Sequence, residues 1–405
     1  MPPPPLGNRD LIRAINRSAV LNMIKMHGPI ARNEVAHRTG LSAATVTGIT
    51  AELITEGLVF EKAPGDSRGG RRPILLALNP RGGYVVGLKL TESQVIGALT
   101  DLEATVIAKR ADPLSGRSPE QAVETLTGVV SALVSEGGIR KKQLLGVGVG
   151  LAGIVDAEQG LVRRSPYFGW RDVPLRDVLQ ARVRVPVYID NDVNTLTLAE
   201  KWFGAGQNVD DFLTVTVGRG VGLGIVANGQ FYRGARGGAG EFGHTVIDPD
   251  GPVCDCGKRG CLETFVGDPG LLRMAAEAAQ RGEMPGPVES MDNLIALAQE
   301  GNPAAQAVFV RAGNVLGREV ANLINVFNPQ RIIISGEGVR AGDWLFGPMR
   351  ASVARHVMPG LAEDTEIRID LWGDDAWARG AASLVLRELF ESPMHREPVK
   401  VEART

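Results

Sequence analysis

Apolar residues near the start of the chain recur at the spacing of one helix face. The pattern predicts a helix from about residue 8 to 26, whose apolar stripe consists of Leu11, Ile12, Ile15, Val20, Leu21 and Ile24. Gly28-Pro29 ends this helix, because proline cannot continue it. Residues 1–7 before it are rich in proline and are expected to be disordered.

Two shorter helices are expected next. The first spans 32–38 and closes at Gly40; the second spans 43–56, where Ser42 can cap its first turn and Gly57 can end it. Two short helices joined by a tight turn are typical of a helix-turn-helix.

Two short apolar runs, 58–60 and 73–78, follow the third helix and predict a pair of strands. The turn between them carries Arg68, Arg71 and Arg72 on a backbone that is rich in glycine. Such a tip can contact phosphates or place guanidinium groups in a narrow minor groove. The strands and their turn therefore predict a wing beside the helix-turn-helix.

The third helix has small side chains near its N-terminus, at Ser42, Ala44, Thr45 and Thr47. In a helix-turn-helix this end normally enters the major groove of DNA. Residues 1–80 hold ten Lys and Arg against six Asp and Glu, whereas the rest of the chain holds 34 against 40. The alternative is a helical protein-interaction domain with a solvated loop. Helix-turn-helix, wing and local positive charge coincide, which favours DNA binding.

After a linker at 79–82, strands and helices alternate. Strands are predicted at 84–90, 95–101, 144–151, 185–189, 212–217, 223–227 and 331–335. Helices are predicted at 120–135, 193–203, 269–281, 291–298, 303–327 and 377–390.

This α/β order, with a β-β-α-β core repeated twice, resembles the two-lobed ribonuclease-H-like fold of sugar kinases and actin, in which ligands lie between the lobes. The predicted domains are a winged head at 1–80, a first lobe at 81–192 completed by about 376–392, and a second lobe at 193–375. Residues 393–405 are polar and are expected to form a flexible tail.

Composition narrows the class of protein. At 405 residues with 44% apolar content, the chain can form more than one core. No segment approaches the ~20 apolar residues of a membrane helix, and the N-terminus lacks the apolar stretch of a signal peptide. We therefore expect a cytoplasmic protein that does not bind membranes. With a net charge of −2, only the head is expected to meet a polyanion.

All three cysteines, Cys254, Cys256 and Cys261, fall within eight positions, and His244 precedes them by ten residues. Three thiolates and one imidazole complete a tetrahedral zinc shell. One disulfide plus a free thiol is the alternative, but a Cys-x-Cys pair bridges poorly with itself. Four protein ligands leave no open position for water, so we predict one structural zinc ion rather than a catalytic one.

Several motifs together resemble the ROK family (repressors, open reading frames and sugar kinases) over nearly the whole chain. They are GEFGH and GPVCDCGKRGCLE around the cysteines, Asp190-Asn191-Asp192-Val193-Asn194, and the glycine-rich run 146–153. The winged head followed by GGRRP resembles the repressor branch, which includes xylose-, N-acetylglucosamine- and glucose-responsive regulators.

The resemblance implies a sugar site lined by Gly153, Asn191, Asp192, Glu241, His244 and Glu263. Carboxylates, an amide and an imidazole suit the paired donor and acceptor hydroxyls of a sugar. His244 would hold zinc with one ring nitrogen and face a sugar hydroxyl with the other. Each carboxylate could instead be a helix cap or a surface charge.

The phosphate loops depart from the pattern of the family's kinases. Lys89 stands where a kinase has an acidic residue, and Arg219 stands where a threonine would meet phosphate. Glu337 adds a carboxylate near the expected adenosine site. Asp192 would be the catalytic base of a kinase. Here it is expected to accept a hydrogen bond from a sugar hydroxyl rather than to catalyse.

We therefore predict a sugar-responsive repressor of carbohydrate-utilisation genes without catalytic residues. Its expected partners are operator DNA, a small sugar such as xylose or glucose, and a second copy of the chain in a homodimer or a dimer of dimers. Two alternatives are kept. One is an ATP-dependent aldose kinase with a regulatory DNA-binding head, and the other is a zinc-dependent interaction scaffold that does not bind DNA.

Overall fold

The structure is a computed structural model that describes residues 9–62, 73–370 and 375–390. The head begins with α1 (Arg9–His27), α2 (Arg32–Thr39) and α3 (Ala43–Thr55). A small antiparallel sheet in the order β1-β3-β2 completes it, from Ile30–Ala31, Leu75–Leu78 and Val59–Lys62 respectively. The predicted helices and strands are present to within a few residues. The predicted wing tip with Arg68, Arg71 and Arg72, the segment 1–7 and the tail 393–405 lie outside the described residues.

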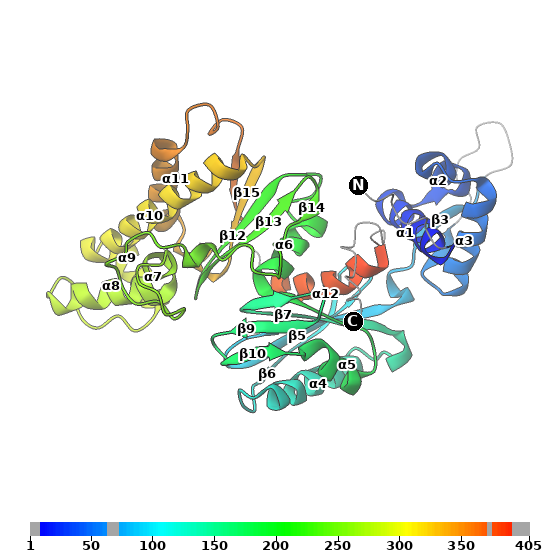
Figure 1. Cartoon of the computed structure of the whole chain (residues 1–405), viewed down its shortest axis with the longest axis horizontal. Helices are drawn as coiled ribbons and strands as arrows, with labels where there is room; N and C mark the ends of the chain where they lie inside the picture. Colours follow the sequence, from blue (N-terminus) through cyan, green and yellow to red (C-terminus); the bar gives the residue numbers. More distant parts are fainter. Residues whose placement is uncertain (1–8, 63–72, 371–374, 391–405) are drawn as a thin grey trace, which may run out of the picture.

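The first lobe is a five-stranded sheet in the order β11-β7-β4-β5-β6. Strands β4 (Tyr84–Leu90), β5 (Gln94–Asp101) and β6 (Val106–Pro113) are antiparallel neighbours, whereas β7 (Leu144–Leu151) and β11 (Val187–Asn191) run parallel to β4. Helices α4 (Pro119–Glu136) and α5 (Leu175–Val183) cover one face of the sheet (Figure 1). A hairpin sheet of β8 (Ile154–Asp156), β9 (Leu161–Ser165) and β10 (Trp170–Val173) extends from it.

The second lobe repeats this strand order. Its sheet runs β14-β13-β12-β15-β16, so that in both lobes the first strand is central, flanked by the second and third on one side and by the fourth and fifth on the other. The strands are β12 (Phe212–Val217), β13 (Val221–Ala227), β14 (Gln230–Phe231), β15 (Arg331–Ser335) and β16 (Glu366–Ile369). The helices are α7 (Glu263–Val266), α8 (Asp268–Gln280), α9 (Met291–Gln299), α10 (Pro303–Phe327) and α11 (Asp343–His356). The predicted two-lobed fold with a repeated core is thus confirmed.

Several elements were not predicted, among them β6, the hairpin β8–β10, α5, α11 and β16. Strand β6 alternates half-buried and exposed residues and carries Lys109, Arg110 and Asp112, so that its sequence is as polar as that of a loop. Helix α11 contains Pro348, which in a sequence indicates an interruption.

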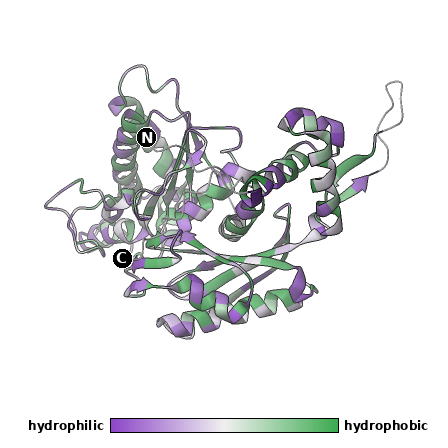
Figure 2. Ribbon diagram, turned by 45° about the vertical axis from the view of Figure 1, so that its right-hand side comes forward, coloured by the Kyte–Doolittle hydropathy of each residue, from purple (hydrophilic) through white to green (hydrophobic). Residues whose placement is uncertain are grey.

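Two helices lie between the two lobes. Helix α6 (Asp192–Phe203) joins the two lobes, and α12 (Asp375–Phe390) returns to pack on β4 and β7 of the first lobe, beside α6 (Figure 1). The strands of the central sheets are mostly hydrophobic and the surrounding loops mostly hydrophilic (Figure 2). Burial on both faces explains the near-continuous apolar runs of β4, β7 and β12.

The head is packed against the body rather than held on a free tether. The predicted linker contains a short 3₁₀ helix (Pro80–Gly82) whose last residue lies against the Gly57 carbonyl.

Further 3₁₀ helices span Lys141–Gln143, Phe242–His244 and Glu337–Ala341. Among the helices that the structure describes, none is long and apolar enough to cross a membrane.

Candidate functional site

The four predicted metal ligands converge. The ligand atoms of His244, Cys254, Cys256 and Cys261 all lie within 4.8 Å of one another. The Sγ atoms of Cys256 and Cys261 are 3.7 Å apart, and His244 Nδ1 lies 3.5 Å from Cys254 Sγ. Zinc–sulfur bonds of ~2.3 Å place two tetrahedral thiolates about 3.8 Å apart, so the donor set and its spacing both fit a zinc ion.

The loop around the cysteines is shaped by its backbone. The Cys254 and Lys258 backbones are hydrogen-bonded, as are Gly257 and Cys254, which folds a tight knuckle. Gly260 is required at its position, because a Cβ there would lie 1.4 Å from the Asp248 carbonyl oxygen and its φ is +65°. The alternative of a disulfide is not observed, since all three cysteines are free.

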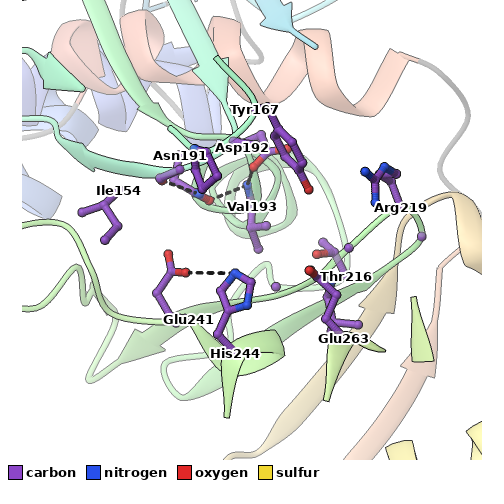
Figure 3. A pocket seen from close by; sticks show the side chains of 18 of the residues that line it. Ile154, Tyr167, Asn191, Asp192, Val193, Thr216, Arg219, Glu241, His244 and Glu263 are labelled. Carbon is purple, nitrogen blue, oxygen red and sulfur yellow. Dashed lines mark hydrogen bonds and ion pairs between the residues drawn. The ribbon is translucent and has the colours of Figure 1, made fainter. Parts of the chain in front are cut away.

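His244 connects this cluster to a cavity. Its Nδ1 faces the cysteines, while its Nε2 lies 3.8 Å from Glu241 Oε2 on the opposite side of the ring (Figure 3). This orientation matches the two roles predicted for the ring. A metal at Nδ1 would fix the tautomer and direct the Nε2–H into the cavity.

The cavity has a volume of about 360 Å³ and lies between the lobes. Each residue predicted for the sugar site lines it: Gly153, Asn191, Asp192, Glu241, His244 and Glu263. Figure 3 shows that their side chains approach from both sides, with Asn191 and Asp192 at the start of α6 and Glu241 and Glu263 opposite.

The N-terminus of α6 holds the first two of these residues. Asn191 caps the helix by accepting hydrogen bonds from the Val193 and Asn194 amides, and its Nδ2 donates to Gly153 O at 3.0 Å. Gly153 itself, with φ +128°, makes room for the Arg164 carbonyl, to which a Cβ would come within 2.3 Å. The close approach that this glycine allows is to protein backbone, and Gly153 also lines the cavity.

Burial raises the pKa of the Asp192, Glu241 and Glu263 carboxyls. The positive charge of Lys89 opposes this effect at Asp192, and His244 opposes it at the two glutamates. Glu263 also accepts a hydrogen bond from the Val221 amide at 3.1 Å. The Glu241 side chain is 40% exposed, so these carboxylates are only partly removed from water, and as charge-assisted acceptors they suit the hydroxyl groups of a sugar.

The two residues that depart from the kinase pattern, Lys89 and Arg219, line the cavity and form ion pairs with other residues of the chain. Lys89 Nζ from the first lobe lies 3.4 Å from Glu337 Oε1 in the second lobe. Arg219 from the second lobe lies 3.5 Å from Glu92 in the first, and 3.6 Å from Asp255. The two cross-lobe pairs occupy this region with side chains that are already paired.

Three aromatic residues that line the cavity, Tyr167, Phe168 and Trp377, were not predicted. Tyr167, in the β9–β10 turn, lies with its ring under the Arg219 guanidinium, and Trp377, in the first turn of α12, lies under Lys89 Nζ at 3.5 Å. Burial, followed by the Glu263 charge, raises the pKa of Tyr167 to about 12. A signal existed for Tyr167: three aromatic residues occupy the four positions 167–170 in a chain with 5% aromatics.

The residues predicted to contact DNA cluster at the start of α3. Ser42, Ala44 and Thr47 are exposed and Thr45 is half-buried. Ser42 Oγ accepts the Thr45 amide as an N-cap, and Thr47 Oγ1 donates to the Ala43 carbonyl. The exposed side chains at the start of α3 are therefore small, and small side chains let a helix approach base edges closely.

Comparisons with known proteins agree with the fold described above. Residues 85–388 match the ROK family. The xylose repressor of Caldicellulosiruptor bescii is 33% identical over 396 residues, which cover 96% of this chain and 99% of that protein. The crystal structure of a ROK family transcriptional regulator, a homologue of the Escherichia coli MLC protein, has a TM-score of 0.84 at 28% identity and covers 94% of this chain and 97% of its own. A ROK family glucokinase from Streptomyces griseus, in complex with glucose and AMPPNP, has a TM-score of 0.66 at 29% identity and covers 75% of this chain and 99% of its own.

Proposed function

The chain belongs to the ROK family, and on this premise we propose that it is a sugar-responsive transcriptional repressor of carbohydrate-utilisation genes. One observation carries the proposal. A helix-turn-helix head is packed onto a kinase-like body whose cavity brings the predicted sugar residues together and engages Lys89 and Arg219 in ion pairs of the chain itself.

Operator DNA is the proposed partner of the head. Residues Ser42, Ala44, Thr45 and Thr47 of α3 read bases in the major groove, and Arg68, Arg71 and Arg72 contact the backbone or the minor groove. Two copies of the chain, as a homodimer or a dimer of dimers, present two heads to two half-sites. Such a protein acts in the cytoplasm. The similarity to the xylose repressor of Caldicellulosiruptor bescii over nearly the full length of both chains supports operator DNA as the partner.

A small neutral sugar is the proposed effector, held by Asn191, Asp192, Glu241, His244 and Glu263. The resident zinc ion is structural. It would be held by His244, Cys254, Cys256 and Cys261, and it supplies no open position for chemistry. Its role is to orient His244 beside Glu241, so that imidazole and carboxylate grip neighbouring hydroxyls. Xylose and glucose are the first sugars to test.

The protein is proposed to lack kinase activity. Phosphoryl transfer depends on backbone amides and cations that are free to surround the phosphates. Here Lys89 is engaged by Glu337 and Arg219 by Glu92 and Asp255, and the Glu337 carboxylate lies against Gly218 of the second phosphate loop. Asp192 then serves as a hydroxyl acceptor.

The proposed domain limits remain those given by the sequence: 1–80, 81–192 with about 376–392, and 193–375. The strands separate into four sheets, and none of these sheets crosses the proposed limits: β1–β3 lie in the head, β4–β7 with β11 and β8–β10 in the first lobe, and β12–β16 in the second lobe. Sugar binding is proposed to favour one closure of the lobes. A hundredfold change in operator affinity requires about 2.7 kcal/mol of coupling, which a few hydroxyl contacts made in one closure state can supply.

A two-stage experiment tests the function. A thermal-shift screen of D-xylose, D-glucose, N-acetyl-D-glucosamine and their phosphates identifies a stabilising ligand. Fluorescence anisotropy with a duplex from upstream of the protein's own gene then measures operator affinity with and without it. A coupled assay for ATP consumption runs in parallel. Sugar-dependent ATP turnover that disappears in Asp192→Asn would establish the kinase instead, and a protein that binds no DNA would establish the scaffold.

A further inference from the structure

Two adjacent helices run from the sugar cavity to the head. Helix α6 begins in the cavity at Asp192 and ends at Trp202 and Phe203. Helix α12 has Trp377 in the cavity at one end and Phe390 at the other. The two helices pack side by side, and at their far ends the rings of Trp202 and Phe390 have centroids 6.0 Å apart. In Figure 1, α12 (red) points from the middle of the body toward α1.

A lysine of the head lies over the aromatic rings at the ends of these helices. Lys25 Nζ, from the last turns of α1, lies 3.7 Å from the centroid of the Trp202 ring, 4.5 Å from that of Phe390 and 5.4 Å from that of Phe203. An ammonium over aromatic faces is attracted by their quadrupoles, and most strongly by tryptophan. One half-buried side chain of the head therefore contacts the ends of both helices.

Helix α6 is closely packed along its length. Its residues 193–200 are all buried, and its twelve residues span roughly 18 Å. The packing on both sides is close. A Cβ on Gly380 of α12 would lie 2.5 Å from the Thr195 carbonyl oxygen, and one on Gly224 of the second lobe would lie 2.0 Å from Thr197 Oγ1. A displacement of the cavity end must therefore appear at the Trp202 end, because the packed interior does not absorb it.

The head shares a hydrophobic core with the far ends of both helices. Val20, Leu21 and Ile24 of α1 share one hydrophobic core with Val385 and Phe390 of α12. Trp202 and Phe203 of α6 pack against the same core, so a displacement carried along α6 changes the ring arrangement around Lys25 without requiring the head to detach.

We infer that the contact of Lys25 with Trp202, Phe203 and Phe390 is the coupling point through which the sugar site controls the DNA-binding head. The inference rests on the proposed function. A sugar bound to Asn191 and Asp192 displaces the start of α6, Trp202 moves against Phe390, and the head adopts a new orientation. In this arrangement Lys25 is a positioning residue that contacts neither sugar nor DNA.

The test compares Lys25→Met with Lys25→Arg, in which a cation remains over the rings. Lys142→Met, at an exposed lysine of the first lobe, is the matched control. For each protein, anisotropy gives operator affinity with and without D-xylose, D-glucose or N-acetyl-D-glucosamine, and calorimetry gives affinity for the sugar. We expect Lys25→Met to reduce the effect of the sugar on operator affinity to less than twofold. Its sugar affinity and its sugar-free operator affinity should change by less than about threefold.

A second readout requires no DNA. Hydrogen exchange of α1 should respond to the sugar in the unaltered protein, in Lys25→Arg and in Lys142→Met, but not in Lys25→Met. A Lys25→Met protein that keeps the full sugar dependence in both measurements overturns the inference and leaves the proposed function standing. An unaltered protein that binds no sugar, or whose DNA binding no sugar changes, overturns the proposed function instead, and the two failures are thereby distinguished.

Discussion

Glu200 in the last turn of α6 predicts an unusual pH dependence of stability. Its carboxyl is fully buried, its Oε2 accepts the Ala205 amide at 2.9 Å, and its Oε1 has no hydrogen-bond partner among the described residues. Burial raises its pKa from 4.5 to about 7, with the Asp370 charge adding to the effect and the Arg368 charge opposing it. The folded state therefore holds the Glu200 proton more tightly than the unfolded state.

The sign follows from this difference in proton binding. The stabilisation from the neutral carboxyl is complete below pH 4.5 and is lost as the pH rises to about 7. Since one pKa unit corresponds to about 1.4 kcal/mol, the loss is on the order of 3 kcal/mol between these limits. In Glu200→Gln this loss is absent, although the new amide N–H₂ lacks a partner at a cost of about 1 kcal/mol. We expect a net gain of about 2 kcal/mol at pH 8.

Thermal unfolding of the two proteins at pH 5, 6, 7 and 8 measures the effect. The melting temperature of Glu200→Gln should exceed that of the unaltered protein by several degrees at pH 8 and by little or nothing at pH 5. The control is Glu289→Gln, at an exposed glutamate, which should leave the melting temperature unchanged at every pH. An equal difference at every pH would refute the reasoning, because it would show that Glu200 has the same pKa in the folded and unfolded states.

Three further predictions concern zinc, sugar and DNA. Cys256→Ser should lose bound zinc, measured by metal analysis, and with it the response to sugar; a zinc-free variant that still responds would remove the proposed bracing of His244. Asp192→Asn should lose sugar binding by calorimetry while operator binding persists, whereas loss of both would indicate a structural role. Arg71→Ala combined with Arg72→Ala should weaken operator binding and lower the slope of log affinity against log salt by about 2. Unchanged binding would exclude the wing tip from the interface.

The sequence predicted features that depend on local spacing. The proposed metal ligands Cys254, Cys256 and Cys261 lie close together in the chain, and one short loop brings them together whatever the rest of the fold does. The helices and strands that line the cavity follow from periodic apolar patterns, since burial on one or both faces dictates those patterns. The sugar-side residues came from the family resemblance, and the structure brings them to one cavity.

Features that depend on distant pairing were not predicted. Tyr167 enters the cavity because the β9–β10 hairpin folds over it, and no pattern within that hairpin specifies what it covers. The cross-lobe pair of Lys89 and Glu337 joins residues 248 positions apart. The sequence marked both residues as departures from a kinase, but only the fold places them opposite each other.

The position of these ion pairs bears on how a kinase-like body can act as a sensor. A kinase needs a cleft that closes around two ligands, whereas a sensor needs closure to depend on the sugar alone. Lys89 and Arg219 join the lobes with opposite polarity, each pairing with a carboxylate across the cleft. These partly exposed pairs are individually weak, so they can hold the lobes near closure without fixing them there. The sugar then needs to contribute only a small difference in free energy to shift the balance, and α6, which begins at the sugar and ends at Lys25, carries that shift to the head.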